Sequence, residues 1–266
     1  MKSMILTLRT LCFICVVWAG NANAGRSCEE SATNPHSVMR GLELAQKTMK
    51  ALDASGGEVA LIARVGQDLS KYNLRYSHIG FVWRDHPEGR WTVMHELNQC
   101  GTANSDLFNE GLGNFFMDDP FAYETLILVP GSAMQQKIVA SLNSPAVNQM
   151  HSAHYNMLSY VFSTTYQNSN QWVLEMLAAA SASDVKINDR TQAQTWLKMA
   201  GFKPITLTIS TATRLGARMF RANVAFDDHP FDRRMAGQID TVTVDSIVRF
   251  VESRDPEVKK IVLKLD

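Results

Sequence analysis

The chain is organised around a ten-residue stretch, Asn168-Ser169-Asn170-Gln171-Trp172-Val173-Leu174-Glu175-Met176-Leu177. An aromatic, turn-prone run ends just before it, so Ser169 is expected where an irregular segment becomes a helix. At such an end the backbone N–H groups lack partners and the helix dipole is positive. Enzymes use that corner to hold a nucleophile and to stabilise an oxyanion. Serine is also a favoured N-cap residue, and the stretch taken alone favours the cap.

Length and composition predict one large folded domain. The chain has 266 residues, of which 45% are hydrophobic and 20% are charged, as in an ordinary globular protein. Its 26 basic and 26 acidic side chains give a formal net charge of zero. This balance does not favour electrostatic capture of nucleic acid, so we expect no nucleic-acid partner.

Residues 1–24 are expected to be a signal peptide. Lys2 and Arg9 supply positive charge, and residues 11–19 form an apolar run too short for an ordinary membrane span. Asn21-Ala22-Asn23-Ala24 then ends the segment in the small-x-small pattern that signal peptidase cleaves. Cleavage after Ala24 predicts a periplasmic or secreted protein without a transmembrane span. An uncleaved membrane anchor is the alternative.

Two cysteines remain after that cleavage, Cys28 and Cys100. An even pair in an oxidising compartment suggests one disulfide that ties the N-terminal arm to the sheet. Neither cysteine lies near Ser169 in the sequence, so neither is the candidate nucleophile.

Hydrophobic periodicity and turn residues predict an α+β fold, an antiparallel sheet with packed helices. Helices are expected at 37–52, 133–142, 170–180, 190–200 and 213–221, and strands at 59–65, 77–84, 91–97, 123–129, 203–210 and 260–265. Residues 239–251 are rich in β-branched residues early and helical late, and the type of 155–162 stays open. The clearest hairpin joins 77–84 to 91–97 through the turn residues 85–89.

Residues 101–120 are rich in Gly, Asn and Asp, with Phe108, Phe115 and Phe116 among them. So long an irregular connection in a compact domain is usually a functional loop or a lid. We therefore expect this segment to pack as a lid over a cleft.

Two histidines of the predicted hairpin are expected to meet on one face of the sheet. Side chains alternate along a strand, so His78 shares a face with Gly80, and His95 shares a face with Val93. The same alternation directs Glu96 to the opposite face. A nucleophile, an adjacent base and a group that orients the base form the general plan of covalent catalysis.

Three motifs carry a resemblance to a known superfamily: Ser77-His78-Ile79-Gly80-Phe81-Val82, Trp91-Thr92-Val93-Met94-His95 and Asn168-Ser169-Asn170-Gln171-Trp172-Val173. Together they resemble the circularly permuted papain-like, NlpC-type fold of lecithin retinol acyltransferase relatives and several bacterial cell-envelope proteins. Over most of the mature chain it resembles, more specifically, a family of exported bacterial proteins of unknown function. The resemblance implies a single permuted papain-like domain over residues 25–266, with N- and C-terminal extensions.

The resemblance also implies the roles of the site residues, with a serine in the usual cysteine position. Ser169 is then the nucleophile, His78 the base and His95 the orienting group, with Glu96 as the alternative third member. A cysteine thiol has a reference pKa of about 8.5 and ionises readily beside a protonated histidine. A serine hydroxyl is far less acidic and attacks only while a base removes its proton. No cofactor or metal is expected.

Three functions remain open on this evidence. The first is an exported hydrolase or acyltransferase that acts on amide or ester bonds through Ser169 and His78. The second is a catalytically inactive papain-like module that binds a peptide, a peptidoglycan fragment or a lipid in the cell envelope. The third is an envelope assembly factor that uses residues 101–120 as a contact surface. The retained histidines favour the first two.

Other polar clusters are interpreted as surface features. His151 and His154 have the spacing of a metal-binding pair, but no cysteine or carboxylate at ligand spacing accompanies them, so a surface turn is favoured. A hydrated, charged loop is likewise favoured over a metal site for the segment that holds Asp227, Asp228, His229 and Asp232.

Overall fold

The structure is a computed structural model that describes residues 34–118, 120–183 and 185–266. The expected signal peptide, its cleavage site and Cys28 lie outside these ranges. The expected pairing of Cys28 with Cys100 therefore stays a prediction.

A six-stranded sheet in the order β4-β3-β2-β1-β5-β8 forms the centre of the described body. Every neighbouring pair in it is antiparallel. Its strands are β1 (Val59–Val65), β2 (His78–His86), β3 (Gly89–Asn98), β4 (Ser105–Gly111), β5 (Ala122–Val129) and β8 (Lys259–Lys264). The expected α+β class, with an antiparallel sheet and packed helices, is confirmed.

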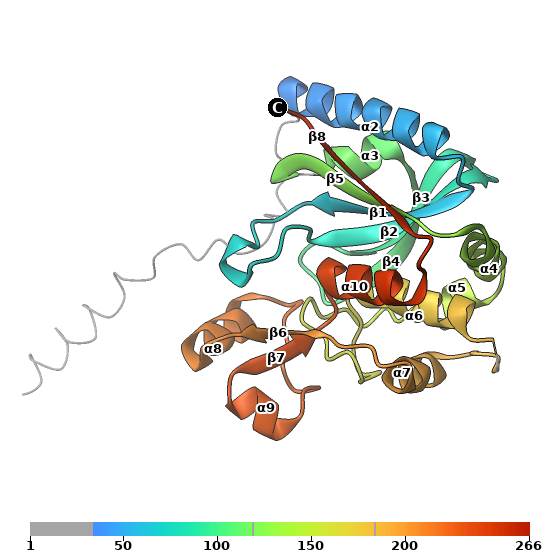
Figure 1. The fold of residues 1–266 in the computed structure, drawn as a ribbon. Helices are drawn as coiled ribbons and strands as arrows, with labels where there is room; N and C mark the ends of the chain where they lie inside the picture. The colour runs from blue at the N-terminus through green and yellow to red at the C-terminus, as the bar shows by residue number, and fades with distance from the viewer. Residues whose placement is uncertain (1–33, 119, 184) are drawn as a thin grey trace, which may run out of the picture. The chain divides into compact units, whose positions relative to one another are not determined.

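Helices cover both faces of this sheet (Figure 1). One face carries α2 (Pro35–Ser55) and α3 (Leu112–Met117). The other carries α4 (Ser132–Leu142), α5 (Ala146–Gln149), α6 (Ser169–Ser181), α7 (Arg190–Met199) and α10 (Val244–Arg254). β1 shows why both faces need a cover, because Leu61 packs with the α6 cluster and Ile62 with the α2 cluster, and all seven of its residues are buried.

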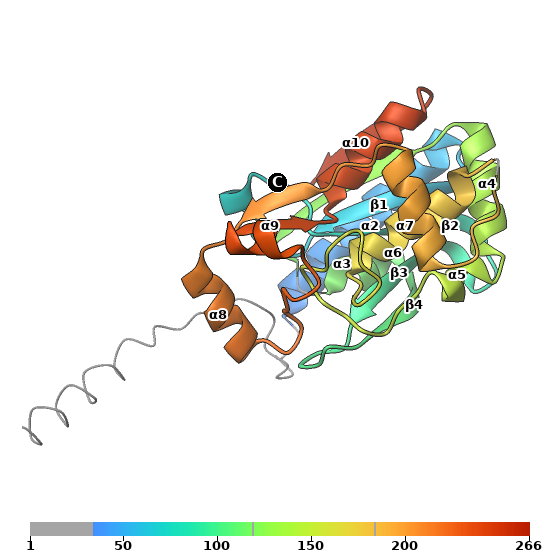
Figure 2. The same ribbon diagram turned by 90° about the horizontal axis from the view of Figure 1, so that it is seen from below.

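A smaller sheet pairs β6 (Ile205–Thr208) with β7 (Gln238–Thr241). It accompanies α8 (Thr211–Phe220) and α9 (Phe231–Met235), and a separate cluster that includes Leu207, Phe226 and Ile239 forms its core. Figure 2 shows α8 at the outer edge of this part, away from the six-stranded sheet. A short 3-10 helix, η1 (Ser70–Tyr72), connects β1 to β2.

The prediction that 101–120 is an irregular lid is wrong. Most of the segment is the edge strand β4 followed by the helix α3. Phe115 and Phe116 are fully buried in the α2 cluster, so they hold α3 on the sheet rather than line a movable loop. Phe108 alone among the three expected lid aromatics is exposed. The use of this segment as a contact surface stays a prediction.

The other expected helices and strands agree with the structure, but the loop expected at 227–237 contains α9. The hairpin forms as β2 and β3, and 239–251 divides into the end of β7 and most of α10. Residues 155–162 form neither a helix nor a named strand. Within the described ranges, no helix is long and apolar enough to cross a membrane.

Candidate functional site

The two hairpin imidazoles meet on one face of the sheet, as predicted. His78 begins β2, His95 lies on β3, and His78 Nε2 is 2.8 Å from His95 Nδ1. Gly80 makes the contact possible, because a Cβ at this position would lie 2.9 Å from both His95 Cβ and the Met94 carbonyl oxygen. The small residue two positions after His78 therefore leaves room for β3 to approach closely at His95.

Glu110 of β4 adds a carboxylate to the pair. Its Oε2 lies 3.3 Å from His95 Nε2, at ion-pair distance but without hydrogen-bond geometry. A carboxylate at this place favours a proton on His95 Nε2, so Nδ1 of the neutral ring accepts from His78 Nε2. These tautomers, assigned from the network, leave a lone pair on His78 Nδ1. The three side chains thus form a chain from Glu110 through His95 to His78, and its last atom, His78 Nδ1, can accept a proton.

Both imidazoles are neutral near pH 7. Burial lowers the pKa of His78 well below its usual value, and the Arg64 guanidinium and His95 lower it further. Burial also lowers the pKa of His95, although Glu110 opposes the shift. The ring of Phe115 contacts both imidazoles, with centroids 6.0 Å from His78 and 5.4 Å from His95. The protonated form of His78 is therefore disfavoured, and the pair carries no permanent positive charge near pH 7.

Ser169 is the first residue of α6, and Asn168 rather than Ser169 is its N-cap. The Asn168 side chain accepts from the Gln171 N–H at 2.9 Å and donates to Thr241 Oγ1 at 3.0 Å. The alternative interpretation of Ser169 as the cap is therefore wrong by one residue. Its hydroxyl does not cap the helix, and it lies beside the phenol of Tyr155, close enough to lower the pKa of that phenol.

Tyr155 is a poor base for that hydroxyl. Burial raises its pKa to about 12, although the neighbouring Ser169 opposes the shift. At neutral pH the phenol is protonated, so it holds Ser169 in place and takes no proton from it.

The serine corner and the imidazole pair lie on different faces of the sheet. His78 alternates with Ile79, which packs in the α6 cluster, whereas Phe115 of α3 contacts the His78 ring. Figure 1 shows α3 and α6 on opposite sides of the sheet. A hydrogen bond connects the two places, in which Asn170 Nδ2 donates to the Ser77 carbonyl oxygen at 3.4 Å.

The structure therefore joins only part of the predicted set. It brings His78 and His95 together and places Ser169 beside Tyr155. In the part of the chain that the structure describes, no hydrogen bond joins Ser169 to either imidazole. The catalytic roles assigned to the three residues stay predictions.

A buried polar network on the α6 face was missed by sequence reasoning. Glu175 of α6 is fully buried and pairs with Arg190, whose Nε donates to its Oε2 at 2.8 Å. Three amides also bind the Glu175 carboxylate, those of Gln167, Gln171 and Gln194. Burial raises the pKa of Glu175, and Arg190 opposes this most. A lone acid inside the apolar run Val173-Leu174-Glu175-Met176-Leu177 was the available signal.

Glu96 lies on the face opposite the imidazoles, as strand alternation predicts. It is 0% exposed, and neither carboxylate oxygen accepts a hydrogen bond of normal geometry, although Ser105 lies beside it. Burial raises its pKa to about 8. It is therefore separate from the His78–His95 pair and is mostly protonated at neutral pH.

The expected hydrated loop at 227–232 is partly buried. His229 Nδ1 lies 2.9 Å from Asp228 Oδ1, and both side chains are fully buried. Asp228 Oδ2 also accepts from the Tyr160 N–H at 2.7 Å, so this pair is structural. Across residues 34–118, 120–183 and 185–266, no group of three or more His, Cys, Asp or Glu side chains is arranged to hold a metal ion.

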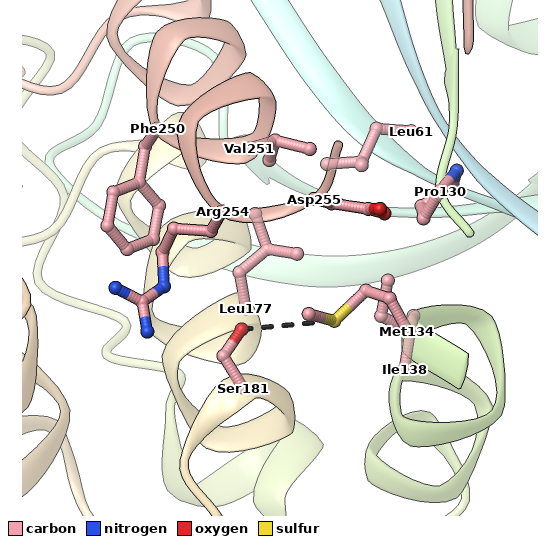
Figure 3. Close-up of a pocket in the computed structure, with 10 residues that line it drawn as sticks. All are labelled: Leu61, Pro130, Met134, Ile138, Leu177, Ser181, Phe250, Val251, Arg254 and Asp255. Carbon is pink, nitrogen blue, oxygen red and sulfur yellow. Dashed lines mark hydrogen bonds between the residues drawn. The ribbon is translucent and has the colours of Figure 1, made fainter. Parts of the chain in front are cut away.

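Two hollows in the described body lie away from these residues. The first is an apolar cavity of about 10 Å³ among β1, α4, α6 and α10, which holds no more than about one water (Figure 3). Its lining includes Leu61, Leu177 and Phe250. The second, of about 480 Å³, lies among α4, α5 and the segment after α6, at the opposite end of that helix from Ser169.

The comparison with protein families gives one match. A family model described as "Uncharacterized protein conserved in bacteria (DUF2145)" matches residues 51–251. No curated protein and no solved structure matches this chain.

Proposed function

We propose that this chain, which belongs to the DUF2145 family of uncharacterized bacterial proteins, is a non-catalytic binding protein of the cell envelope with a permuted papain-like core. One observation carries the proposal: the hydroxyl at the nucleophile position lies beside the protonated phenol of Tyr155, and in the described ranges it hydrogen-bonds neither imidazole. A serine nucleophile needs a base that takes its proton during attack. Ser169 has no such partner among the described residues.

The order of the elements supports the papain-like part of the proposal. The permuted fold places a histidine on one strand, a polar residue on the next and the nucleophile position at the start of a later helix. His78 on β2, His95 on β3 and Ser169 at the start of α6 keep that order. The contact between His78 and His95 corresponds to a base and its orienting group.

The ligand proposed for this module is a peptide, a peptidoglycan fragment or a lipid. The signal-like residues 1–24 support an exported protein that meets such molecules in the periplasm or outside the cell.

A serine hydrolase or acyltransferase is the second candidate function. The observation that favours it is the chain Glu110–His95–His78, which directs a lone pair to His78 Nδ1. Catalysis by Ser169 then requires its hydroxyl to leave Tyr155 and α6 to shift far enough to carry Ser169 past the start of β2 to the face of His78. The Asn170–Ser77 contact, at 3.4 Å, is the link that such a shift would change.

The test compares labelling with binding in the chain that starts at Gly25. We expect a fluorophosphonate probe not to label it, and we expect it to bind one of three preparations. These are peptidoglycan sacculi, soluble muropeptides and a short-chain phospholipid below its micelle concentration. Ser169→Ala should leave that binding unchanged, because the hydroxyl contacts Tyr155 rather than the ligand.

Ser181→Ala, at the other end of α6, is the matched control for losing one hydroxyl of this helix. Labelling that disappears in Ser169→Ala and persists in Ser181→Ala would refute the non-catalytic proposal and establish the second candidate. Absence of binding to all three preparations, with no labelling, would refute the binding function.

A further inference from the structure

Helix α8 presents large apolar side chains to solvent. Leu215, Met219 and Phe220 are 60%, 76% and 80% exposed. Single exposed apolar side chains are ordinary on a protein surface, but three within six residues of one helix form a patch that calls for a partner. The next helix along the chain, α9, adds exposed Phe231 and Met235.

Basic side chains accompany this patch. Arg218 lies on α8 and Arg221 follows its last residue, whereas the helix carries no acidic residue. Arg218 Nη1 lies 3.5 Å from Asp227 Oδ1, and both side chains are largely exposed. Such a solvated pair contributes little stability, so the Arg218 guanidinium can exchange its partner for another anion.

The fold holds α8 with the apolar side chains outward. Ser210 caps the helix by accepting from the Thr213 N–H. Arg214 on the inner side is buried and donates to the Ile209 carbonyl oxygen at 3.1 Å and to Thr211 Oγ1 at 3.3 Å. Both views show α8 at the edge of the small-sheet part, where its outer side meets no other described element (Figures 1 and 2).

We propose that α8 is a docking helix for an anionic phospholipid surface. An amphipathic helix with aromatic or aliphatic residues and arginines lies in the plane of the membrane interface, with its apolar side chains at the boundary between headgroups and acyl chains. Met219 and Phe220 are the deepest anchors by exposure, and Arg218 and Arg221 meet the lipid phosphates. With ten residues, α8 is too short to span a bilayer.

The positive charge of Arg218 and Arg221 favours an anionic lipid surface over a second copy of the chain as the partner of α8. A symmetric dimer through α8 would place the same patch of both copies together and bring Arg218 and Arg221 close to their own counterparts. An anionic lipid surface complements both the apolar and the basic side chains. The surface is separate from the Ser169 corner, so the proposal does not depend on the function proposed above.

The test measures binding of the chain that starts at Gly25 to sonicated vesicles. We expect sedimentation with vesicles of phosphatidylglycerol and phosphatidylcholine, and much weaker binding to phosphatidylcholine alone. Met219→Ser with Phe220→Ser should lower the partition coefficient by at least about tenfold, because two anchors are lost. Arg218→Gln should lower it about fivefold on the anionic vesicles only.

Met199→Ser is the matched control, since Met199 is 84% exposed but lies on α7. All variants replace exposed residues, and thermal unfolding checks that they remain folded. Equal binding to both kinds of vesicle, or an equal loss of binding in Met199→Ser, would overturn the proposal. So would a dimer in solution that Met219→Ser with Phe220→Ser dissociates, without any vesicle binding.

Discussion

Glu96→Gln is expected to stabilise the protein, by an amount that grows with pH. Glu96 is fully buried and its carboxylate oxygens lack hydrogen bonds of normal geometry, so burial raises its pKa from 4.5 to about 8. The folded state therefore keeps a proton that the unfolded state releases above pH 4.5. A carboxyl whose pKa is higher in the folded state lowers the free energy of unfolding as pH rises from the unfolded pKa to the folded pKa.

The size of the effect follows from the two pKa values. Each pH unit between 4.5 and 8 costs the folded state about 1.4 kcal/mol. At pH 7, about 2.5 units above the unfolded value, the carboxyl lowers the free energy of unfolding by about 3 kcal/mol. Glutamine has the same shape as the protonated acid and does not titrate, so the variant is free of this loss.

Urea unfolding at pH 5, 6 and 7 measures the difference between the two proteins. We expect the free energies of unfolding to be similar at pH 5 and to differ by about 2 to 3 kcal/mol more at pH 7 in favour of Glu96→Gln. Other titrating groups are present in both proteins and cancel. Glu43→Gln, on the exposed side of α2, controls for removing one carboxyl. A difference that does not change with pH would refute the reasoning.

Two further changes test the packing around the site. Gly80→Ala should destabilise the fold by about 1–3 kcal/mol, because its Cβ would lie 2.9 Å from His95 Cβ and from the Met94 carbonyl oxygen. Gly216→Ala in α8, where a Cβ meets nothing within 4 Å, should cost nothing, and equal thermal melting of the two variants would contradict this. Arg190→Met should destabilise by about 3–5 kcal/mol, because it leaves the carboxylate of Glu175 buried without its cation. Adding Glu175→Gln to Arg190→Met should restore much of the free energy of unfolding measured in urea, and a double variant no more stable than the single one would show that the ion pair is not the cause.

The local pattern of the sequence was enough for the sheet hairpin and its imidazoles. Alternation along a strand depends only on the backbone, so His78 and His95 were assigned correctly to one face and Glu96 to the other. The start of α6 was also predicted within one residue, because helix capping depends on neighbours in the chain. These features involve contacts whose sequence separation is short or whose direction is set by the backbone.

The lid prediction failed because burial overrode composition. Gly, Asn and Asp between 101 and 120 favour a loop, but Phe115 and Phe116 bury their rings under α2 and make α3 part of the core. Sequence reasoning missed Glu110 for the same reason, because a loop has no fixed register with the strand of His95, whereas β4 pairs with β3 and brings Glu110 beside it. Propensity is a weak guide wherever large apolar side chains find a distant surface to cover.

The sequence by itself determined the α+β sheet, the meeting of His78 with His95 and the helix that begins at Ser169. Only the tertiary structure decided what Ser169 touches. The pairing of its hydroxyl with Tyr155, and the opposite faces taken by α3 and α6, depend on how the segment before α6 and the two helix layers pack on the sheet. Motif order specifies which residue types occur in which elements, whereas hydrogen bonding between their side chains requires packing that brings them within about 3 Å.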